Sequence, residues 1–286
     1  MVADRAGEGA ADVAEELRLE QALGKRAAVD AEERSVGVRR GGVDGAGEEL
    51  LARAALPEDT DVQVGVLDLL DQVFALDHDT ADGESLHWVS TYGSVTFNVV
   101  GRELPWSGMN EAGLVIGMAA VPEAYVPADP DKETVDSLGI IRLALDEAAT
   151  VDEAIDLMRN HNTTFEGQTP LNYLLADATG DAALVEYYAG EIRVLRTPND
   201  WHHATNFLLS EFESPDGRCA RYDTIAEELE STGGGLDADA ALSLLERVAQ
   251  PHTQWSVVYG ITSRDIHVAM GQAYDQVHTF SLEMRG

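Results

Sequence analysis

The chain has 286 residues, with 52 Asp and Glu against 19 Lys and Arg, which gives a formal net charge of -33. A surface this acidic repels nucleic-acid phosphates, so the composition predicts no nucleic-acid partner. No apolar run reaches the roughly 18 residues that a membrane-spanning helix needs, and the first residues lack the basic and apolar regions of a secretory signal. We therefore expect a soluble, cytoplasmic protein that does not bind a membrane.

The basic residues are almost all arginines, because Lys25 and Lys132 are the only lysines. An acidic surface that avoids lysine suits molar salt, where the Debye length falls to about 3 Å and the self-repulsion of the chain is screened. We interpret the composition as that of a halophilic, acidic proteome. An ordinary acidic bacterial protein is the alternative.

The first 60 residues differ in composition from the rest. They hold eight of the 19 basic residues and contain no Trp, Tyr, Phe or Cys. Residues 12–34 favour a helix by composition, but their apolar side chains form only two short pairs, so there is little to bury. We predict a loosely ordered segment over 1–60 and a folded domain over 61–286, in which 62–66 is the best candidate for an early strand.

The most informative stretch runs from Trp88 to Pro122. Val95, Phe97 and Val99 recur at every second position, which is typical of a strand with one buried face. Residues 113–121 are apolar throughout, as in a strand that is covered on both faces. We interpret the stretch as a long hairpin, with strands over 92–100 and 113–121 and with the polar residues 108–111 in the turn.

Helices and strands alternate in the rest of the chain. Thr150 and Glu153 form a capping box that predicts the start of a helix. The spacing of apolar residues predicts helices and strands in turn, as in an α+β domain. The predicted helices are at 137–149, 150–160, 222–230 and 237–249, and the predicted strands are at 255–261, 266–270 and 278–283. Three further strands within 169–195 are implied by the family resemblance that follows.

These motifs together resemble the choloylglycine hydrolase family of linear amide C–N hydrolases, which includes bile-salt hydrolases and penicillin V acylases. The hairpin carries the first part of the resemblance. The later parts follow in the family's order, and they are residues 169–195, 204–207 (ATNF), 220–222 (ARY) and 252–261 (HTQWSVVYGI). Each part is weak alone, but their common order argues against chance.

The resemblance implies a four-layer αββα sandwich of the N-terminal-nucleophile type, here with an atypical N-terminal extension. It implies a small-molecule N-acyl amide as substrate, attacked by a Cys that is exposed as the first residue and whose α-amino group acts as the base. Asn206 would donate to the developing oxyanion, and Arg221 would support the region of the nucleophile. The second oxyanion Asn of bile-salt hydrolases corresponds to Ala120. An Asn in a turn and an exposed Arg at a helix start are the alternatives.

The family's nucleophile is missing from its expected place ahead of the hairpin. Residues 36–51, VGVRRGGVDGAGEELL, contain neither a Cys nor the Gly-Arg-Asn-x-Asp type motif that follows it in the family. The only cysteine is Cys219, at a predicted helix start, so we expect a structural role for it. Two interpretations stay open: a misassigned gene start or reading frame, and a non-catalytic paralogue that binds a ligand or a partner.

The histidines show no metal-binding pattern. His202 and His203 are adjacent, which would place them on opposite faces of an extended strand, and His78 lies between two aspartates. The chain also has no phosphate-binding Gly loop, no dinucleotide fingerprint and no Gly-x-Ser-x-Gly elbow. We therefore expect no metal and no cofactor. A homo-oligomer is open, because the family that the chain resembles often forms tetramers.

Overall fold

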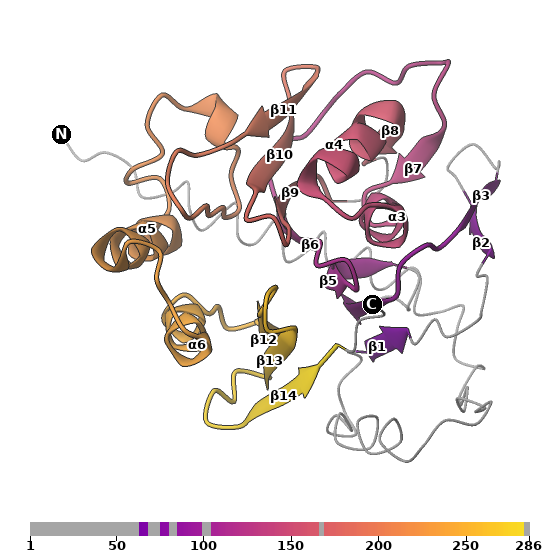
Figure 1. The fold of residues 1–286 in the computed structure, drawn as a ribbon. Helices are drawn as coiled ribbons and strands as arrows, with labels where there is room; N and C mark the ends of the chain where they lie inside the picture. The colour runs from indigo at the N-terminus through magenta and orange to yellow at the C-terminus, as the bar shows by residue number, and fades with distance from the viewer. Residues whose placement is uncertain (1–62, 68–74, 80–84, 99–103, 166–168, 283–286) are drawn as a thin grey trace, which may run out of the picture. The chain divides into compact units, whose positions relative to one another are not determined.

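The computed structural model describes residues 63–67, 75–79, 85–98, 104–165 and 169–282, with side chains described from Trp88 onward (Figure 1). Apart from Thr169, these residues belong to one compact unit that covers 56–165 and 170–286. The predicted segment 1–60, its helix and the window 36–51 lie outside the described residues. No helix in the described part of the chain is long and apolar enough to cross a membrane.

A seven-stranded sheet forms the centre of the unit, and its neighbouring strands are all antiparallel. The predicted early strand is confirmed as β1, which pairs with β4, and the three strands predicted within 169–195 are β9, β10 and β11. The order across the sheet is β1 (Gln63–Leu67), β4 (Ser94–Asn98), β5 (Pro105–Asn110), β6 (Val115–Ala120), β9 (Leu171–Ala176), β10 (Ala182–Tyr188) and β11 (Glu191–Leu195).

The predicted hairpin is wrong, because its supposed turn is part of the strand β5, which lies between β4 and β6. Gly108 misled the prediction. A Cβ at this position would lie 2.7 Å from both Leu145 Cδ1 and the Val95 carbonyl oxygen, so the glycine is needed for close packing and not for a turn. The neighbouring Met109 is fully buried. The chain therefore forms a three-stranded meander here.

Two helices cover one face of this sheet. They are α3 (Gly139–Glu147) and α4 (Val151–Asn160), both close to their predicted bounds, and they share a hydrophobic core with β6, β9 and β10. The predicted capping box is confirmed in its first contact, because Glu153 N donates to Thr150 Oγ1 at 3.2 Å, whereas the Glu153 carboxylate accepts at 2.7 Å from the N–H of Ala149, one residue before the N-cap. Two small sheets flank these elements, β2 (Ala75–Asp79) with β3 (Ser85–Val89) and β7 (Thr134–Asp136) with β8 (Asn162–Thr164).

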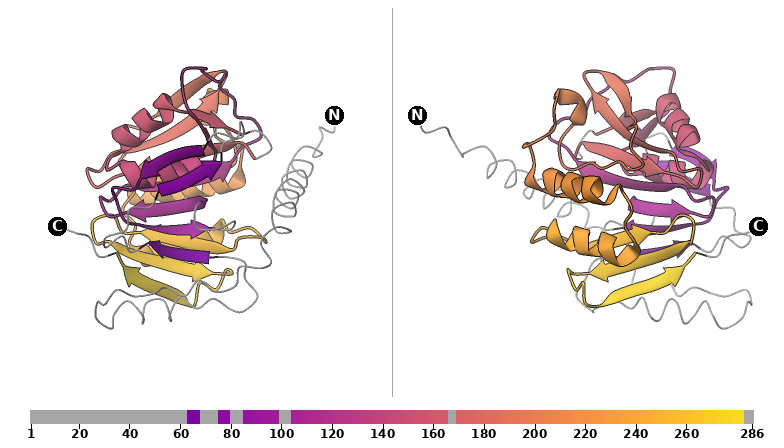
Figure 2. Two further views of the ribbon diagram at one scale, coloured as in Figure 1. Left: turned by 90° about the vertical axis from the view of Figure 1, so that its right-hand side faces the viewer. Right: turned by 60° about the vertical axis from the view of Figure 1, so that its left-hand side comes forward.

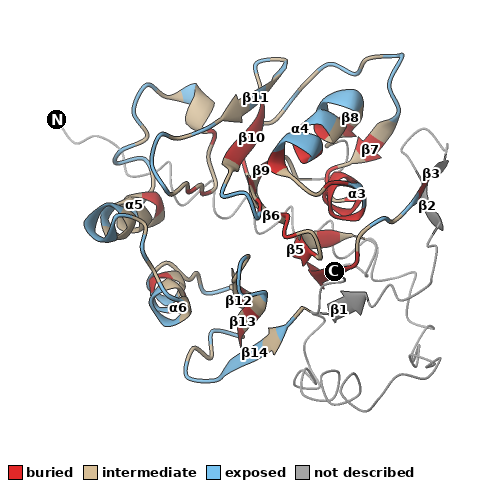
Figure 3. Cartoon of the chain, viewed as in Figure 1, coloured by how far each residue is buried: buried red, intermediate tan, exposed pale blue. Residues whose placement is uncertain are grey.

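The opposite face of the large sheet packs against a second sheet of three strands, β12 (Trp255–Tyr259), β13 (Asp265–Met270) and β14 (Val277–Ser281), close to the predicted bounds. Phe97 and Met109 meet Ile266 and Val268 in a second hydrophobic core. Figure 2 shows the three-stranded sheet beside the large sheet, and Figure 3 shows buried stretches in β5 and β13. The predicted helices α5 (Ala220–Thr232) and α6 (Ala238–Arg247) precede these strands in the chain, and α6 contacts β12. The predicted α+β architecture of two helical layers around two sheets is confirmed.

Candidate functional site

The two residues that the sequence marked as site residues are in contact. Arg221, in the first turn of α5, donates from Nη2 to Asn206 Oδ1 at 2.9 Å, and Asn206 donates from Nδ2 to the Ala120 carbonyl oxygen at 2.8 Å. Ala120 is the last residue of β6. It is the position that the family resemblance placed opposite the second oxyanion Asn of bile-salt hydrolases. Three positions that are far apart in the sequence therefore meet at the end of a central strand.

The contacts of Asn206 determine which way its amide group faces. A guanidinium group can only donate hydrogen bonds, so the oxygen of the amide must face Arg221 and its nitrogen must face away. The nitrogen carries two hydrogens, of which Ala120 accepts one. Among the described residues, no acceptor engages the other. An amide that is polarised by a cation on one side and offers a free N–H on the other can stabilise a developing oxyanion.

Aromatic rings hold the segments on both sides of this pair. The ring of His203 lies against Tyr222, with centroids 4.0 Å apart, and Trp201 packs on His203 at 5.4 Å. Phe207 meets Tyr222 edge to face at 5.2 Å. These contacts join residues near Asn206 to the residue after Arg221, so they help to hold the segments that carry Asn206 and Arg221 together.

His203 is neutral at neutral pH. Its side chain is 8% exposed, and burial, with a smaller effect from His202, lowers its pKa to about 4. Its Nε2 atom is buried and has no hydrogen-bond partner among the described residues. The site therefore contains an uncharged imidazole beside the aromatic rings.

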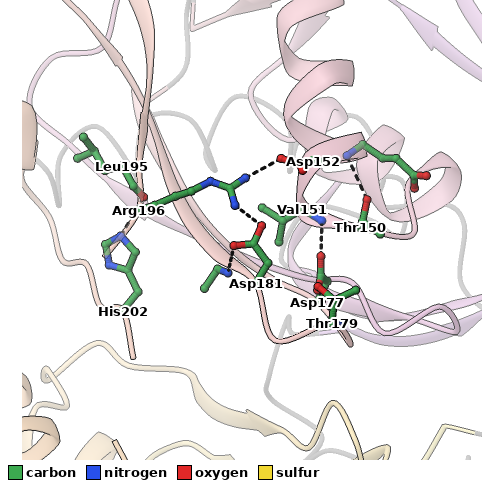
Figure 4. Close-up of polar contacts among 11 residues, drawn as sticks. Thr150, Val151, Asp152, Asp177, Thr179, Asp181, Leu195, Arg196 and His202 are labelled. Carbon is green, nitrogen blue, oxygen red and sulfur yellow. Dashed lines mark hydrogen bonds and ion pairs between the residues drawn. The ribbon is translucent and has the colours of Figure 1, made fainter. Parts of the chain in front are cut away.

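The predicted extended strand at His202 and His203 is wrong, because residues 201–205 lie in no strand. His203 N donates to His202 Nδ1 at 2.9 Å. His202 Nε2 lies 3.0 Å from the Leu195 carbonyl oxygen (Figure 4). Because a carbonyl oxygen only accepts, Nε2 carries the proton. The His202 imidazole thus accepts the hydrogen bond from the backbone N–H of His203, which a strand would use to pair with its neighbour.

Figure 4 also shows that Arg196 ties two elements together beside His202. Its guanidinium contacts Asp181, directly before β10, and lies 2.7 Å from Asp152 at the start of α4. Asp177 accepts from Val151 N at 2.7 Å. Each of these acidic side chains already engages a chain partner. The described residues contain no group of three or more His, Cys, Asp or Glu that could hold a metal ion.

Cys219 is the N-cap residue of α5, at the helix start as predicted, and it is partly buried. Its carbonyl oxygen accepts from Asp223 N at 3.0 Å, which begins the helix that carries Arg221. The observed role of this residue is to start α5.

Sequence analysis missed two buried polar residues next to the site. Glu186 on β10 and Asn172 on β9 are 0% and 1% exposed, and both contact the segment that carries Asn206. A signal existed for Glu186, because it is the only charged residue in the otherwise apolar strand AALVEYY. A charge inside a buried strand requires fixed partners.

Comparison with solved structures identifies the class of fold as that of the N-terminal-nucleophile hydrolases. The penicillin V acylase of Agrobacterium tumefaciens matches with a TM-score of 0.57 at 20% identity, over 73% of this chain and 75% of that one. A variant of the conjugated bile acid hydrolase of Clostridium perfringens matches with a TM-score of 0.57 at 12% identity, over 76% of this chain and 86% of that one. At these identities the likeness shows the fold alone.

Sequence comparison then gives the family. The family model for acyl-coenzyme A:6-aminopenicillanic acid acyl-transferase matches residues 69–283. A penicillin V acylase of Pectobacterium atrosepticum is 30% identical over 140 residues, which cover 44% of this chain and 35% of that protein, so the chain spans about a third of the length of this relative. The protein belongs to the acyl-coenzyme A:6-aminopenicillanic acid acyl-transferase family, and its predicted kinship with the choloylglycine hydrolases is confirmed.

Proposed function

We propose that the end of β6 binds the amide group of a small-molecule N-acyl amide and that the protein belongs functionally with the linear amide C–N hydrolases. One observation carries this proposal: Asn206 is held between Arg221 and the Ala120 carbonyl oxygen, and among the described residues no acceptor takes its second amide N–H. That N–H is suited to the carbonyl oxygen of a bound amide, which becomes an oxyanion during hydrolysis. Arg221 keeps the amide of Asn206 in this orientation.

A second candidate function is a binding module without catalysis. The single cysteine of the sequence favours it, because Cys219 caps α5 and the family's chemistry needs a thiol with a free α-amino group. We therefore expect the chain of this sequence to bind an N-acyl amide without turning it over. Both candidates use the same amide-binding site, so one experiment tests the site and separates the two.

The affinity for penicillin V, an N-acyl amide, can be measured by isothermal titration calorimetry in molar salt. We expect Asn206→Ala and Arg221→Ala to lower the affinity by about tenfold each, which corresponds to about 1.4 kcal/mol. Asn199→Ala, in an exposed turn, is the matched control and should bind like the wild type. An affinity that is unchanged in Asn206→Ala would refute the proposed site.

Turnover is measured in the same samples by mass spectrometry of the released acid. We expect none above background for the wild type and for Cys219→Ser. Turnover that Cys219→Ser abolishes would make Cys219 the nucleophile and would overturn this part of the proposal. Turnover that survives in Cys219→Ser would reject the non-catalytic candidate and would require another nucleophile.

A further inference from the structure

The segment that carries Asn206 has no regular structure of its own to hold it. Within 204–212 the backbone hydrogen bonds of the described residues are all local: Phe207 N to Thr205 O at 2.9 Å, Glu211 N to Leu208 O at 3.3 Å, and Phe212 N to Leu209 O at 3.1 Å. None joins this backbone to the backbone of a neighbouring element. The position of the segment on the sheet therefore depends on side chains.

Glu186 supplies the strongest of these side-chain contacts. Its Oε1 accepts from Leu209 N at 2.6 Å and its Oε2 accepts from Ser210 N at 2.9 Å. The two oxygens of one carboxylate thus hold two consecutive backbone N–H groups, three and four residues after Asn206. Charge-assisted hydrogen bonds of this length are about twice as strong as neutral ones.

Asn172 supplies a second, weaker contact, to the residues on both sides of Asn206. Its Nδ2 lies 3.5 Å from the carbonyl oxygens of both Thr205 and Phe207, the residues on either side of Asn206. Glu186 and Asn172 project from the sheet face opposite the helices α3 and α4, because their strand neighbours Val185 and Tyr173 lie in the core shared with those helices. The sheet therefore contacts the segment at two places: Asn172 lies next to the neighbours of Asn206, and Glu186 binds Leu209 and Ser210.

The carboxylate of Glu186 is not explained by an ion pair. Arg193 is its direct partner across β10 and β11, but the Arg193 guanidinium is exposed and lies 3.1 Å from Glu191. Burying a carboxylate costs several kcal/mol, which its hydrogen bonds must offset. Leu184, two residues earlier on the same face, shows that an apolar side chain fits this face of the strand. The observed hydrogen-bond partners of the Glu186 carboxylate are the two backbone N–H groups of the segment, at Leu209 and Ser210.

We propose that Glu186 is a positioning residue that sets the place of the Asn206 amide relative to Ala120 and Arg221. The proposal rests on the proposed function of Asn206. Asn206 would bind the substrate, and the buried Glu186 would hold the segment that carries Asn206. Glu186 itself does not touch the reacting atoms. A variant that lacks the charge of Glu186 should therefore remain folded, but its Asn206 amide should be displaced.

Glu186→Gln tests this directly, because it keeps the shape and replaces one acceptor oxygen by an NH2 group that cannot accept. In protein labelled with ¹⁵N-leucine and ¹⁵N-asparagine, the NMR signals of the Leu209 amide and of the Asn206 side-chain NH2 are followed. Asn206→Ala assigns the side-chain pair by its disappearance. We expect Glu186→Gln to shift both signals and to weaken penicillin V binding by about tenfold, and Glu186→Asp to restore part of both effects.

Glu191→Gln, at an exposed position of β11, is the matched control and should leave both signals and the affinity unchanged. A Glu186→Gln protein that melts at a lower temperature but keeps the Asn206 signal and the affinity would show a merely structural role and overturn the proposal. If Glu186→Gln does not fold, the same readouts on Glu186→Asp decide. If the wild type does not bind penicillin V, the proposed function fails, and the Asn206 signal alone still decides whether Glu186 positions it.

Discussion

The side chain of Asn206 is oriented by what its neighbours can donate and accept. Arg221 can only donate and the Ala120 carbonyl can only accept, so the amide has one orientation that satisfies both. His203 beside it is constrained in a different way, because burial keeps its imidazole neutral. We therefore expect pH to act at this place through His203, whose ring packs against Tyr222.

We predict that protonation of His203 makes stability fall as the pH drops from 6.5 towards 4. Its pKa is lowered from 6.5 to about 4 in the folded chain. Between these values the unfolded chain binds a proton that the folded chain does not bind. The contribution of His203 to the free energy of unfolding is therefore complete above pH 6.5. Below that pH it decreases by at most roughly 1.4 kcal/mol per pH unit. His203→Phe, which keeps a ring against Tyr222, should flatten the dependence in this window.

Urea unfolding at constant high salt, in steps from neutral pH to about pH 4, measures this effect as the difference between wild type and variant. The carboxylates contribute equally to both curves, so the difference isolates His203. His278→Gln, at an exposed position of β14, is the control and should parallel the wild type. Parallel curves for His203→Phe and the wild type would contradict the prediction.

At the scale of the element, the end of α3 is held by side chains and by a neighbouring loop. Asn110 donates to the carbonyl oxygens of Leu145 at 3.0 Å and Ala148 at 2.7 Å, which the helix itself leaves unpaired. Asp146 accepts from Trp88 Nε1 at 2.8 Å and contacts Arg142 one turn earlier, and both charged side chains are about 1% exposed. The end of α3 is thereby fixed to the strands that it covers.

We predict that Asp146→Ala destabilises the domain by roughly 3–5 kcal/mol, because Arg142 would remain buried without its counter-charge. Asp156→Ala is the matched control. It removes an exposed aspartate that lies 3.8 Å from Arg159 on the next helix, α4, and should cost less than about 1 kcal/mol. Chemical denaturation of the three proteins measures the difference. Similar losses in both variants would show that the buried pair contributes no more than a surface pair.

At the scale of the whole molecule, charge is the dominant feature, and we propose that it reflects adaptation to high salt. With a net charge of -33, the folded chain repels itself unless ions screen it. We predict a lower melting temperature and a less cooperative transition when NaCl is reduced from molar to about 0.1 M, where the Debye length grows from about 3 to about 10 Å. Circular dichroism melts across this range measure it, and equal melting temperatures at both ends would contradict the halophilic interpretation.

Salt of equal ionic strength but different type separates screening from effects on apolar burial. Sodium chloride and potassium chloride screen alike, whereas sulfate also strengthens burial because it is excluded from the protein surface. If screening is the cause, the melting temperature should follow ionic strength in both chlorides. Stabilisation by sulfate alone would place the effect in the hydrophobic cores instead.

The sequence by itself determined the elements whose signals are local. The contact of Thr150 with Glu153 acts within one helical turn, so the start of α4 was predicted close to its true position, whereas the three strands within 169–195 followed from the family resemblance. The family resemblance also marked Asn206 and Arg221, because its short motifs survive in the chain. These features need no knowledge of what lies opposite them in space.

Only the tertiary structure decided the features whose causes are distant in the sequence. The sequence suggested that Gly108 is a turn residue, and β5 was therefore not predicted. In the structure the glycine allows Leu145 to pack closely against the strand. The use of Glu186 depends on backbone N–H groups more than twenty residues later, at Leu209 and Ser210. A buried polar group is stabilised by whichever partner the fold brings within about 3 Å, and a sequence pattern does not specify that partner.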